Sequence, residues 1–353
     1  MSKIALITDT HFGIKSDSPI FYEYFDRFLD NVFFPELDRR KIDKIIHLGD
    51  VFDRRKTVNF NTLTWARNSF FDRIEERATM DIIVGNHDTY YKNTNNVNSP
   101  DLLLGDYSNI RIFEETYEED NLIYVPWLTD ENTEESLKKI SKSSANILLG
   151  HLQVKGFSMF KGAICDHGLS SDVFHNYDLV LSGHFHIKND SSNIYYLGCP
   201  WDLMFTDVDD IKGFHILDTE NASLEFIQNP YKLFNRIYYD DSTITSIKDI
   251  LLSEKKYNEL TNTFVKVIIK SKTNPIFFDR FCERLTDANP YSVVYAEQFL
   301  ELESSDEVAT LSEDTLSLLK SSISDYSDLL TDNVKTKELE SLLSDLYLEA
   351  IKL

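Results

Sequence analysis

Short clusters of aspartate, asparagine and histidine follow five apolar stretches in the first 186 residues of this chain. Each comes directly after a run of strand length: Asp9-Thr10-His11, Gly49-Asp50 with Asp53, Gly85-Asn86-His87-Asp88, Gly150-His151 and Gly183-His184-Phe185-His186. Carboxylate, amide and imidazole groups without a thiolate suit Mn²⁺, Fe or Zn²⁺. Seven such side chains exceed the need of one ion, and a single carboxylate can bridge two, so the pattern predicts a site for two cations.

Two cations about 3.5–4 Å apart can clamp the attacking and leaving oxygens of an in-line displacement at phosphorus. They also lower the pKa of a bound water toward about 7. The alternative is that polar residues simply fill the turns after strands. That alternative requires all five turns to carry ligand types by accident, so the pattern favours metal-dependent hydrolysis of a phosphoester.

The elements around these clusters must bring them together. The apolar runs 4–7, 45–48 and 80–84 are separated by helical segments, 21–37 and 63–77. Strands that alternate with helices predict a mostly buried α/β sheet. In such sheets ligands bind beyond the carboxyl ends of the strands, so the five clusters are expected at one edge. Glycine before Asp50, Asn86, His151 and His184 would allow the backbone to turn closely there.

The five clusters together, in this order, resemble the calcineurin-like metallophosphoesterases. The resemblance implies an α/β fold in which a sandwich of two sheets is flanked by helices. It also implies that one ion is held by Asp9, His11, Asp50 and His186, and the other by Asp50, Asn86, His151 and His184, with Asp50 bridging. His87 would face the phosphate as an acid or charge stabiliser, oriented by Asp88.

Within this superfamily the chain is similar to the SbcD-type recombination and repair nucleases, their phage members above all. The segments that carry this resemblance are 49–55, 85–93, Pro126-Trp127, 150–186 and Gly198-Cys199-Pro200-Trp201. It implies a nuclease that acts on DNA with two divalent ions, Mn²⁺ first and Mg²⁺, Fe or Zn²⁺ as alternatives. It also implies an SbcC-like SMC-type ATPase as partner and a homodimer within a heterotetramer. A phosphomonoesterase with the same metals, or a non-catalytic scaffold for the ATPase, are the competing hypotheses.

One position departs from some cellular relatives, which have histidine where Asp53 stands. We interpret Asp53 as a residue that orients a ligand histidine. The basic residues Arg54, Arg55, Lys56 and Lys92 could contact DNA phosphates, or could form a solvated loop paired with local acids. His47 lies inside an apolar strand and is interpreted as a core histidine. His167, His175 and His215 fall outside the clusters and are interpreted as structural.

The chain changes character after its first 215 residues, because no glycine or histidine follows His215. We predict a nuclease domain over 1–231 and a small α+β capping domain, facing DNA, over 232–298. The capping domain would contain a strand at 263–269, a helix at 277–285 and a strand at 292–295. An acidic linker would follow over 299–314, because 297–314 contains seven acids and no base.

A helical pair is predicted over 315–353. Leucines and other apolar residues recur there in steps of three and four. We interpret this stripe as a docking surface for the ATPase, although the two helices could also pack on each other. The residues expected to dock are Leu316, Leu319, Ile323, Leu339, Leu342, Leu343 and Leu346.

Composition sets limits on partners and compartment. With 36 basic and 59 acidic side chains, the formal net charge of the 353 residues is −23, which argues against diffuse binding to DNA or to anionic membranes. Three widely spaced cysteines argue against a disulfide scaffold. The apolar start reaches Asp9 too soon for a signal peptide. We therefore expect a cytoplasmic protein without membrane contact, in the host cytoplasm if a phage encodes it.

Overall fold

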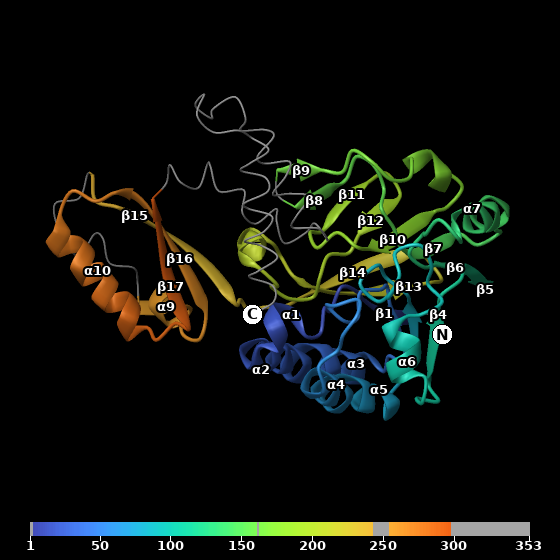
Figure 1. Ribbon diagram of the computed structural model, residues 1–353, viewed down its shortest axis with the longest axis horizontal. Coiled ribbons are helices and arrows are strands. Elements are labelled where there is room, and N and C mark those ends of the chain that lie inside the picture. Colours follow the sequence, from blue (N-terminus) through green and yellow to red (C-terminus); the bar gives the residue numbers. More distant parts are fainter. Residues whose placement is uncertain (1–2, 161, 243–253, 298–353) are drawn as a thin grey trace, which may run out of the picture. The chain divides into compact units, whose positions relative to one another are not determined.

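The computed structural model describes residues 3–160, 162–242 and 254–297 (Figure 1). The chain divides into two compact units, of which the first ends at Asn235 and the second begins at Arg236. The predicted acidic linker and helical pair lie outside the described residues, as do all seven predicted docking residues.

The first sheet of unit 1 has six strands in the order β14-β13-β1-β2-β3-β4. Strands β1 to β4 run parallel, whereas β13 and β14 are antiparallel to their neighbours. The carboxyl ends of β1, β2 and β3 therefore meet at one edge. The bounds are β1 (Lys3–Ile7), β2 (Lys44–His47), β3 (Thr79–Ile83), β4 (Ile110–Phe113), β13 (Gly213–Asp218) and β14 (Ser223–Gln228).

The second sheet also has six strands, in the order β11-β12-β10-β7-β6-β5. Its four central strands are parallel and its two outer strands antiparallel. A short hairpin, β8 (Ser158–Phe160) and β9 (Ala163–Ile164), follows β7. The sheet strands are β5 (Tyr117–Glu119), β6 (Leu122–Val125), β7 (Ile147–His151), β10 (Leu179–Gly183), β11 (Asn189–Ser191) and β12 (Ile194–Tyr196).

Alternate residues of the second sheet enter two different cores. Leu149 and Leu181 pack with Leu6 of β1 in the core between the two sheets. Their neighbours Leu148 and Val180 face the opposite way and belong to a separate core. Both faces of the sheet are therefore buried, as the continuous apolar runs indicated. The predicted sandwich of two sheets is confirmed.

Helices cover the outer face of the first sheet. Figure 1 shows α2 to α5 together on that side, and their aromatic side chains pack around Phe12 and Trp201. The predicted helices at 21–37 and 63–77 are confirmed, although each contains a π-helical turn. The bounds are α1 (Ile14–Asp17), α2 (Pro19–Phe28), η1 (Leu29–Phe33), α3 (Phe34–Arg40), α4 (Phe60–Ala66), η2 (Arg67–Phe71), α5 (Asp72–Glu75), α6 (Ser99–Leu104), α7 (Thr133–Lys142), η3 (Ser171–Phe174) and η4 (Phe205–Asp209).

The described part of unit 2 is a three-stranded sheet with two helices. Its strands are β15 (Phe234–Asp240), β16 (Phe264–Ser271) and β17 (Ser292–Glu297), and its helices are α9 (Glu254–Asn258) and α10 (Pro275–Asp287). Strands β16 and β17 are parallel, so α10 makes the crossover between them. The three elements predicted here are confirmed, and β15 adds a strand that the sequence pattern did not indicate. No helix in the described ranges of either unit has the length and apolar character needed to span a membrane.

Candidate metal centre

All seven predicted metal ligands lie at one edge of the two sheets of unit 1. Three strands of the first sheet and two of the second end there. Three groups of side chains have ligand atoms within 4.8 Å of one another: Asp9, His11 and His186; His11, Asp53 and His87; and Asp50, His151 and His184. The sheet topology therefore brings together residues that lie up to 177 positions apart, from Asp9 to His186.

The first group joins β1 to the loop after β10. Nε2 of His11 lies 3.0 Å from Nε2 of His186 and 4.0 Å from Oδ1 of Asp9. The carboxylate of Asp9 also accepts the backbone N–H of His184 at 3.1 Å. This hydrogen bond ties the end of β1 to the second sheet, so it fixes where His184 and His186 enter the site.

The second group is arranged around the amide of Asn86. Its Oδ1 lies 2.9 Å from Nε2 of His151 and 2.8 Å from Nδ1 of His184. On its other ring nitrogen, His151 donates from Nδ1 to the carbonyl of Leu48 at 2.7 Å. That contact uses Nδ1, so Nε2 is the ring nitrogen of His151 that faces Asn86 and could bind a cation.

Asp50 stands between the two groups. Its Oδ2 lies 3.8 Å from Nε2 of His11 and 3.3 Å from Nε2 of His151. Its Oδ1 accepts the backbone N–H of His87 at 2.7 Å. This is the position that a carboxylate must occupy to be shared by two cations.

The backbone is unusual at the same residues. Four of the seven candidate ligands have positive φ without being glycine: Asp9 (50°), His11 (46°), Asp50 (56°) and His184 (89°). Non-glycine residues in this region cost of order 1–3 kcal/mol each and cluster at functional sites. The fold thus accepts backbone strain in order to aim these side chains.

Two glycines allow the close packing that the sequence predicted. A Cβ on Gly49 would lie 2.4 Å from Nδ1 of His151, and Gly49 has a φ of +97°. A Cβ on Gly85 would lie 2.3 Å from the backbone nitrogen of Asp50. Neither contact is sterically tolerable, so only glycine permits these approaches.

The charges of the site are strongly coupled. Burial favours the neutral form of Asp50, but the imidazoles of His151 and His87 outweigh it and hold the pKa of Asp50 well below its ordinary value. Burial also opposes charge on His11, yet Asp53 and Asp50 raise the pKa of His11 to about 9. Conversely, burial and the nearby His151 lower the pKa of His184 to about 3. The protein alone therefore holds ionised and neutral groups side by side.

These donors fit divalent cations. Asp9 and Asp50 are 0% and 1% exposed, and no ion pair of the described residues joins either one to lysine or arginine. Buried carboxylates are costly unless they are paired with cations or bind metals. Oxygen and imidazole donors without a thiolate match Mn²⁺, Fe or Zn²⁺. The side chains present are thus suited to cations as partners.

His87 and Asp88 differ from expectation in how they are held. The ring of His87 is oriented through Nδ1, 2.6 Å from the backbone carbonyl of Asp53, and not by Asp88. The buried carboxylate of Asp88 instead accepts backbone N–H groups of Gly85 and Asp50 at 2.9 Å each, and of Val51 at 2.9 Å. Asp88 therefore clamps the loop after β2 to the loop after β3, because its short side chain is turned toward these amides.

Asp53 lies beside His11, and His47 lies in the core at the end of β2. Oδ1 of Asp53 is 3.4 Å from Nδ1 of His11, and its role in orienting that ring stays a prediction. His47 is fully buried, with Nε2 3.0 Å from Oγ1 of Thr10 and Nδ1 accepting the N–H of Gly49. Burial lowers the pKa of His47 to about 3, as befits a neutral core histidine.

The basic residues beside the site are partly engaged. Arg54 pairs with Asp17 at 2.5 Å, which agrees with the solvated-loop interpretation. Nη1 of Arg55 lies 3.5 Å from Oγ1 of Thr89. Lys56 lies over the ring of exposed Tyr90 at 5.7 Å. A DNA contact by these residues or by Lys92 stays a prediction.

Two residues near the site were missed by the sequence analysis. The indole of Trp127 lies 4.9 Å from the ring of His184 and 6.0 Å from that of His151, so it forms a wall of the centre. The buried ammonium of Lys212 donates to the carbonyl of His186 at 2.8 Å and pairs with Asp207 at 2.8 Å. Trp127 lay in a segment of the family resemblance, whereas nothing in the pattern around Lys212 pointed to the site.

Comparison with known proteins agrees with this geometry. The family model for calcineurin-like phosphoesterases matches residues 2–188. The chain belongs to the calcineurin-like phosphoesterase family. Over 272 residues this phosphoesterase is 34% identical to "Exonuclease subunit 1" of Enterobacteria phage T4, and the match covers 76% of each chain. The family resemblance predicted from the sequence is confirmed.

Two solved structures were also found to be similar to this phosphoesterase. An archaeal phosphodiesterase is 15% identical with a TM-score of 0.32, over 64% of this chain and 99% of the other. The calcineurin-like phosphoesterase YfkN from Bacillus subtilis is 13% identical with a TM-score of 0.32, over 64% of this chain and 88% of the other.

Proposed function

We propose that this phosphoesterase is a DNA nuclease that hydrolyses phosphodiester bonds with two divalent cations. The observation that carries the proposal is the 34% identity to a phage exonuclease subunit across 76% of both chains, together with the seven donors at one edge. One cation would be held by Asp9, His11, Asp50 and His186, and the other by Asp50, Asn86, His151 and His184. Cations bound there would supply Lewis acidity toward the phosphate and acidify water.

The protein's own groups have defined tasks in this proposal. Asp53 and the carbonyl of Leu48 orient the ligand rings of His11 and His151. His87, held through its Nδ1 by the carbonyl of Asp53, presents the rest of its ring to the site and would donate a proton or stabilise charge on the phosphate. Asp88 keeps the two loops that carry Asp50 and Asn86 in register.

We also propose that the protein works as a subunit beside an SMC-type ATPase and as a homodimer. The relative's printed name, a subunit, supports a partner. The net charge of −23 supports it as well, because a strongly acidic chain repels DNA phosphates over long range. DNA affinity would then depend on the cations, on a local basic patch or on the partner.

Product analysis tests the nuclease assignment. The full-length chain with Mn²⁺ or Mg²⁺ is incubated with labelled duplex DNA, with single-stranded DNA and with nitrophenyl phosphate, with and without the ATPase. We expect DNA cleavage that needs metal, weakens with added salt and is accelerated by the ATPase. The Asp50→Asn variant should be inactive, whereas His175→Ala, which changes an exposed histidine outside the clusters, should cut normally. Efficient hydrolysis of the nitrophenyl monoester without DNA cleavage would instead identify a phosphomonoesterase.

A further inference from the structure

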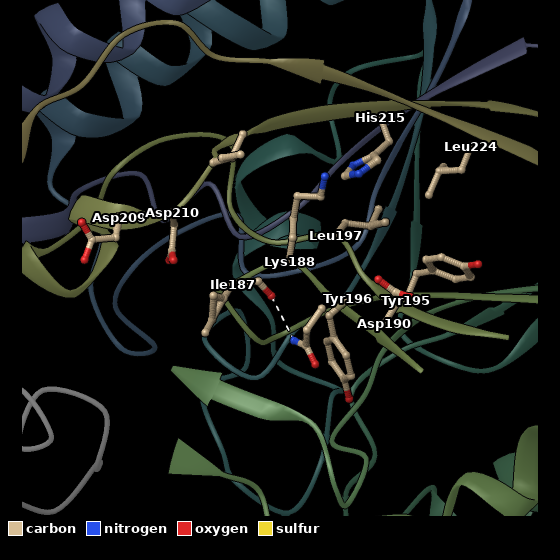
Figure 2. A pocket seen from close by; sticks show the side chains of 12 residues that line it. Ile187, Lys188, Asp190, Tyr195, Tyr196, Leu197, Asp209, Asp210, His215 and Leu224 are labelled. Atoms are coloured by element: carbon tan, nitrogen blue, oxygen red, sulfur yellow. Dashed lines mark hydrogen bonds between the residues drawn. The ribbon is translucent and has the colours of Figure 1, made fainter. Parts of the chain in front are cut away.

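A cavity of about 360 Å³ opens at the edge of the gap between the two sheets of unit 1 (Figure 2). His215 and Leu224 of the first sheet line one side of it, and Asp190 and Tyr195 of the second sheet line another. None of the candidate metal ligands lines it. Its volume falls at the small end of the range for pockets that bind small molecules, about 300–1,000 Å³.

One lining side chain is buried without a partner for its polar atom. His215 is only 3% exposed, and its Nδ1 has no hydrogen-bond partner. Burial lowers the pKa of His215 to about 3, so the ring is neutral, and one of its nitrogens carries a proton to donate. Leaving such an atom unpaired costs free energy, which a ligand could recover.

A lysine ammonium lies beside this histidine. Figure 2 shows the Lys188 side chain extending to the His215 ring, and the positive charge of Lys188 contributes to the low pKa of His215. The ammonium lies 3.4 Å from the centre of the Phe226 ring, and among the described residues it makes no ion pair within 4.0 Å. Lys188 is exposed on one side, so its ammonium can reach a charged group that enters the cavity beside the buried ring of His215.

The remaining walls differ in character. Leu197 and Leu224 give apolar surface next to the ring of Tyr195. Figure 2 shows Asp209 and Asp210 at the side away from Lys188 and His215, where carboxylates can accept hydrogen bonds from hydroxyl or amino groups. The pocket thus has Lys188 and His215 near its centre, apolar side chains on one side of them and the two aspartates on the other (Figure 2).

We propose that this pocket binds a nucleoside monophosphate, with the phosphate at Lys188 and His215 and the base against Leu197 and Leu224. The class of ligand is inferred from the pocket alone. The proposal therefore stands or falls independently of the nuclease assignment.

Calorimetric titration of the full chain in EDTA tests the proposal without any contribution from the metal centre. The three probes are deoxyadenosine 5′-monophosphate, deoxyadenosine and inorganic phosphate. We expect the monophosphate to bind more tightly than either fragment. Lys188→Met should weaken its binding about tenfold or more, the value of one charge-assisted hydrogen bond. Leu224→Trp, which fills the apolar part, should abolish binding.

Lys270→Met is the matched control, because Lys270 also lies over an aromatic ring, that of Tyr238 at 4.7 Å, but in unit 2. It should bind the monophosphate as the unaltered chain does. The proposal is overturned if the unaltered chain gives no binding at millimolar monophosphate, or if Lys188→Met binds it equally well. If inorganic phosphate bound as tightly as the monophosphate, the nucleoside would contribute nothing to binding, and a nucleotide would be excluded as the ligand.

Discussion

Asp50 lies between the two groups of candidate ligands and faces both with a single oxygen atom. Its Oδ2 lies within 3.8 Å of His11 in one ligand group and 3.3 Å of His151 in the other, while its Oδ1 is held by a backbone amide. Because the carboxylate is fixed at both oxygens, the distance between two bound cations would be set by the protein and not by the substrate. That is the arrangement in which in-line displacement at phosphorus is assisted.

His87 should be needed for cleavage but not for metal binding. Its ring reaches Asp53 through Nδ1, and no hydrogen bond of the described residues joins the ring to a candidate ligand, while the backbone N–H that Asp50 accepts is kept in an alanine variant. We expect His87→Ala to lower the cleavage rate about 10²–10⁴-fold, the usual contribution of a positioned acid–base group. Mn²⁺ titration should give an unchanged stoichiometry. Cleavage by the variant within threefold of the unaltered chain would contradict this role.

Lys212 should position His186 as a metal ligand. Its ammonium donates to the carbonyl of His186 at 2.8 Å and is neutralised by Asp207 and Asp210. We expect Lys212→Met to weaken one of two Mn²⁺ binding events about 10–100-fold, as loss of an orienting partner typically does. Calorimetric titration with Mn²⁺ measures this directly.

Lys44→Met is the control for Lys212. Like Lys212→Met, this change removes the lysine partner of a buried aspartate, here Asp81 at 2.5 Å. Lys44, however, lies at the start of β2, at the opposite end of that strand from the candidate site. Circular dichroism should show both variants folded. If the two variants bind Mn²⁺ alike, Lys212 is structural only.

Single residues differ in how far the sequence could predict them. The position of the seven candidate ligands at one edge was predictable because each follows an apolar run that must be a buried strand. Lys212 was not, since a lysine before a strand is common and its contact with His186 depends on the tertiary fold. The role of Asp88 was predicted wrongly, because sequence proximity to His87 does not reveal which amides a carboxylate will face.

At the scale of elements, unit 2 has its own organising carboxylate. Asp241, just after β15, accepts hydrogen bonds from the backbone amides of Thr273 and Asn274 at 2.7–2.9 Å and from the hydroxyl of Ser271 at 3.1 Å. These contacts join the end of β15 to the turn that leads into α10. The sequence predicted β16, α10 and β17 but not β15. The junction at Asp241 was not predicted either, because no sequence pattern marks a carboxylate that binds amides 32 and 33 residues away.

Asp241 should make the stability of unit 2 depend on acid pH. Burial disfavours its charge, but the amides of Asn274 and Thr273 outweigh this and lower the pKa of Asp241 to about 2. The unfolded chain has the ordinary value near 3.8, so the stabilisation is complete above about pH 4 and is lost as the pH falls toward 2. Asp241→Asn should cost about 1.5 kcal/mol or more at pH 7.

The measurement is urea unfolding of the full chain between pH 7 and pH 2, followed by hydrogen exchange in α10. Asp240→Asn is the control, because Asp240 is exposed and its hydrogen bonds within the described chain are to neighbouring Ser242. The difference between the variant and the unaltered chain should shrink as the pH falls below about 4 and nearly close by about pH 2. A gap that stays constant across this range would show that the charge of Asp241 does not stabilise the unit.

The helices show another limit of prediction from sequence. The apolar periodicity indicated continuous helices at 21–37 and 63–77, and the structure interrupts both with π-helical turns, Leu29–Phe33 and Arg67–Phe71. One phenylalanine of each turn, Phe33 in the first and Phe70 in the second, is buried in the aromatic core. Packing of large rings decides where the extra residue is accommodated, and periodicity alone cannot locate it.

For the whole molecule, the strongly acidic composition opposes the burial of carboxylates that the fold requires. The chain carries a net charge of −23, yet it buries Asp9 and Asp50 with histidines, and no lysine or arginine of the described residues, as their ion-pair partners. Bound cations would relieve that repulsion locally, so metal binding should also stabilise unit 1 through linkage. This links the chemistry of the site to the folding of the sandwich that builds it.

The number of Mn²⁺ ions per chain tests the central claim most directly. Calorimetric titration combined with anomalous scattering from Mn²⁺-soaked crystals would measure both the stoichiometry and the ligands. We predict two ions per chain, with Asp50 as a ligand of both and His151 and His186 on different ions. A single ion, or two ions of which neither contacts Asp50, would contradict the two-cation account.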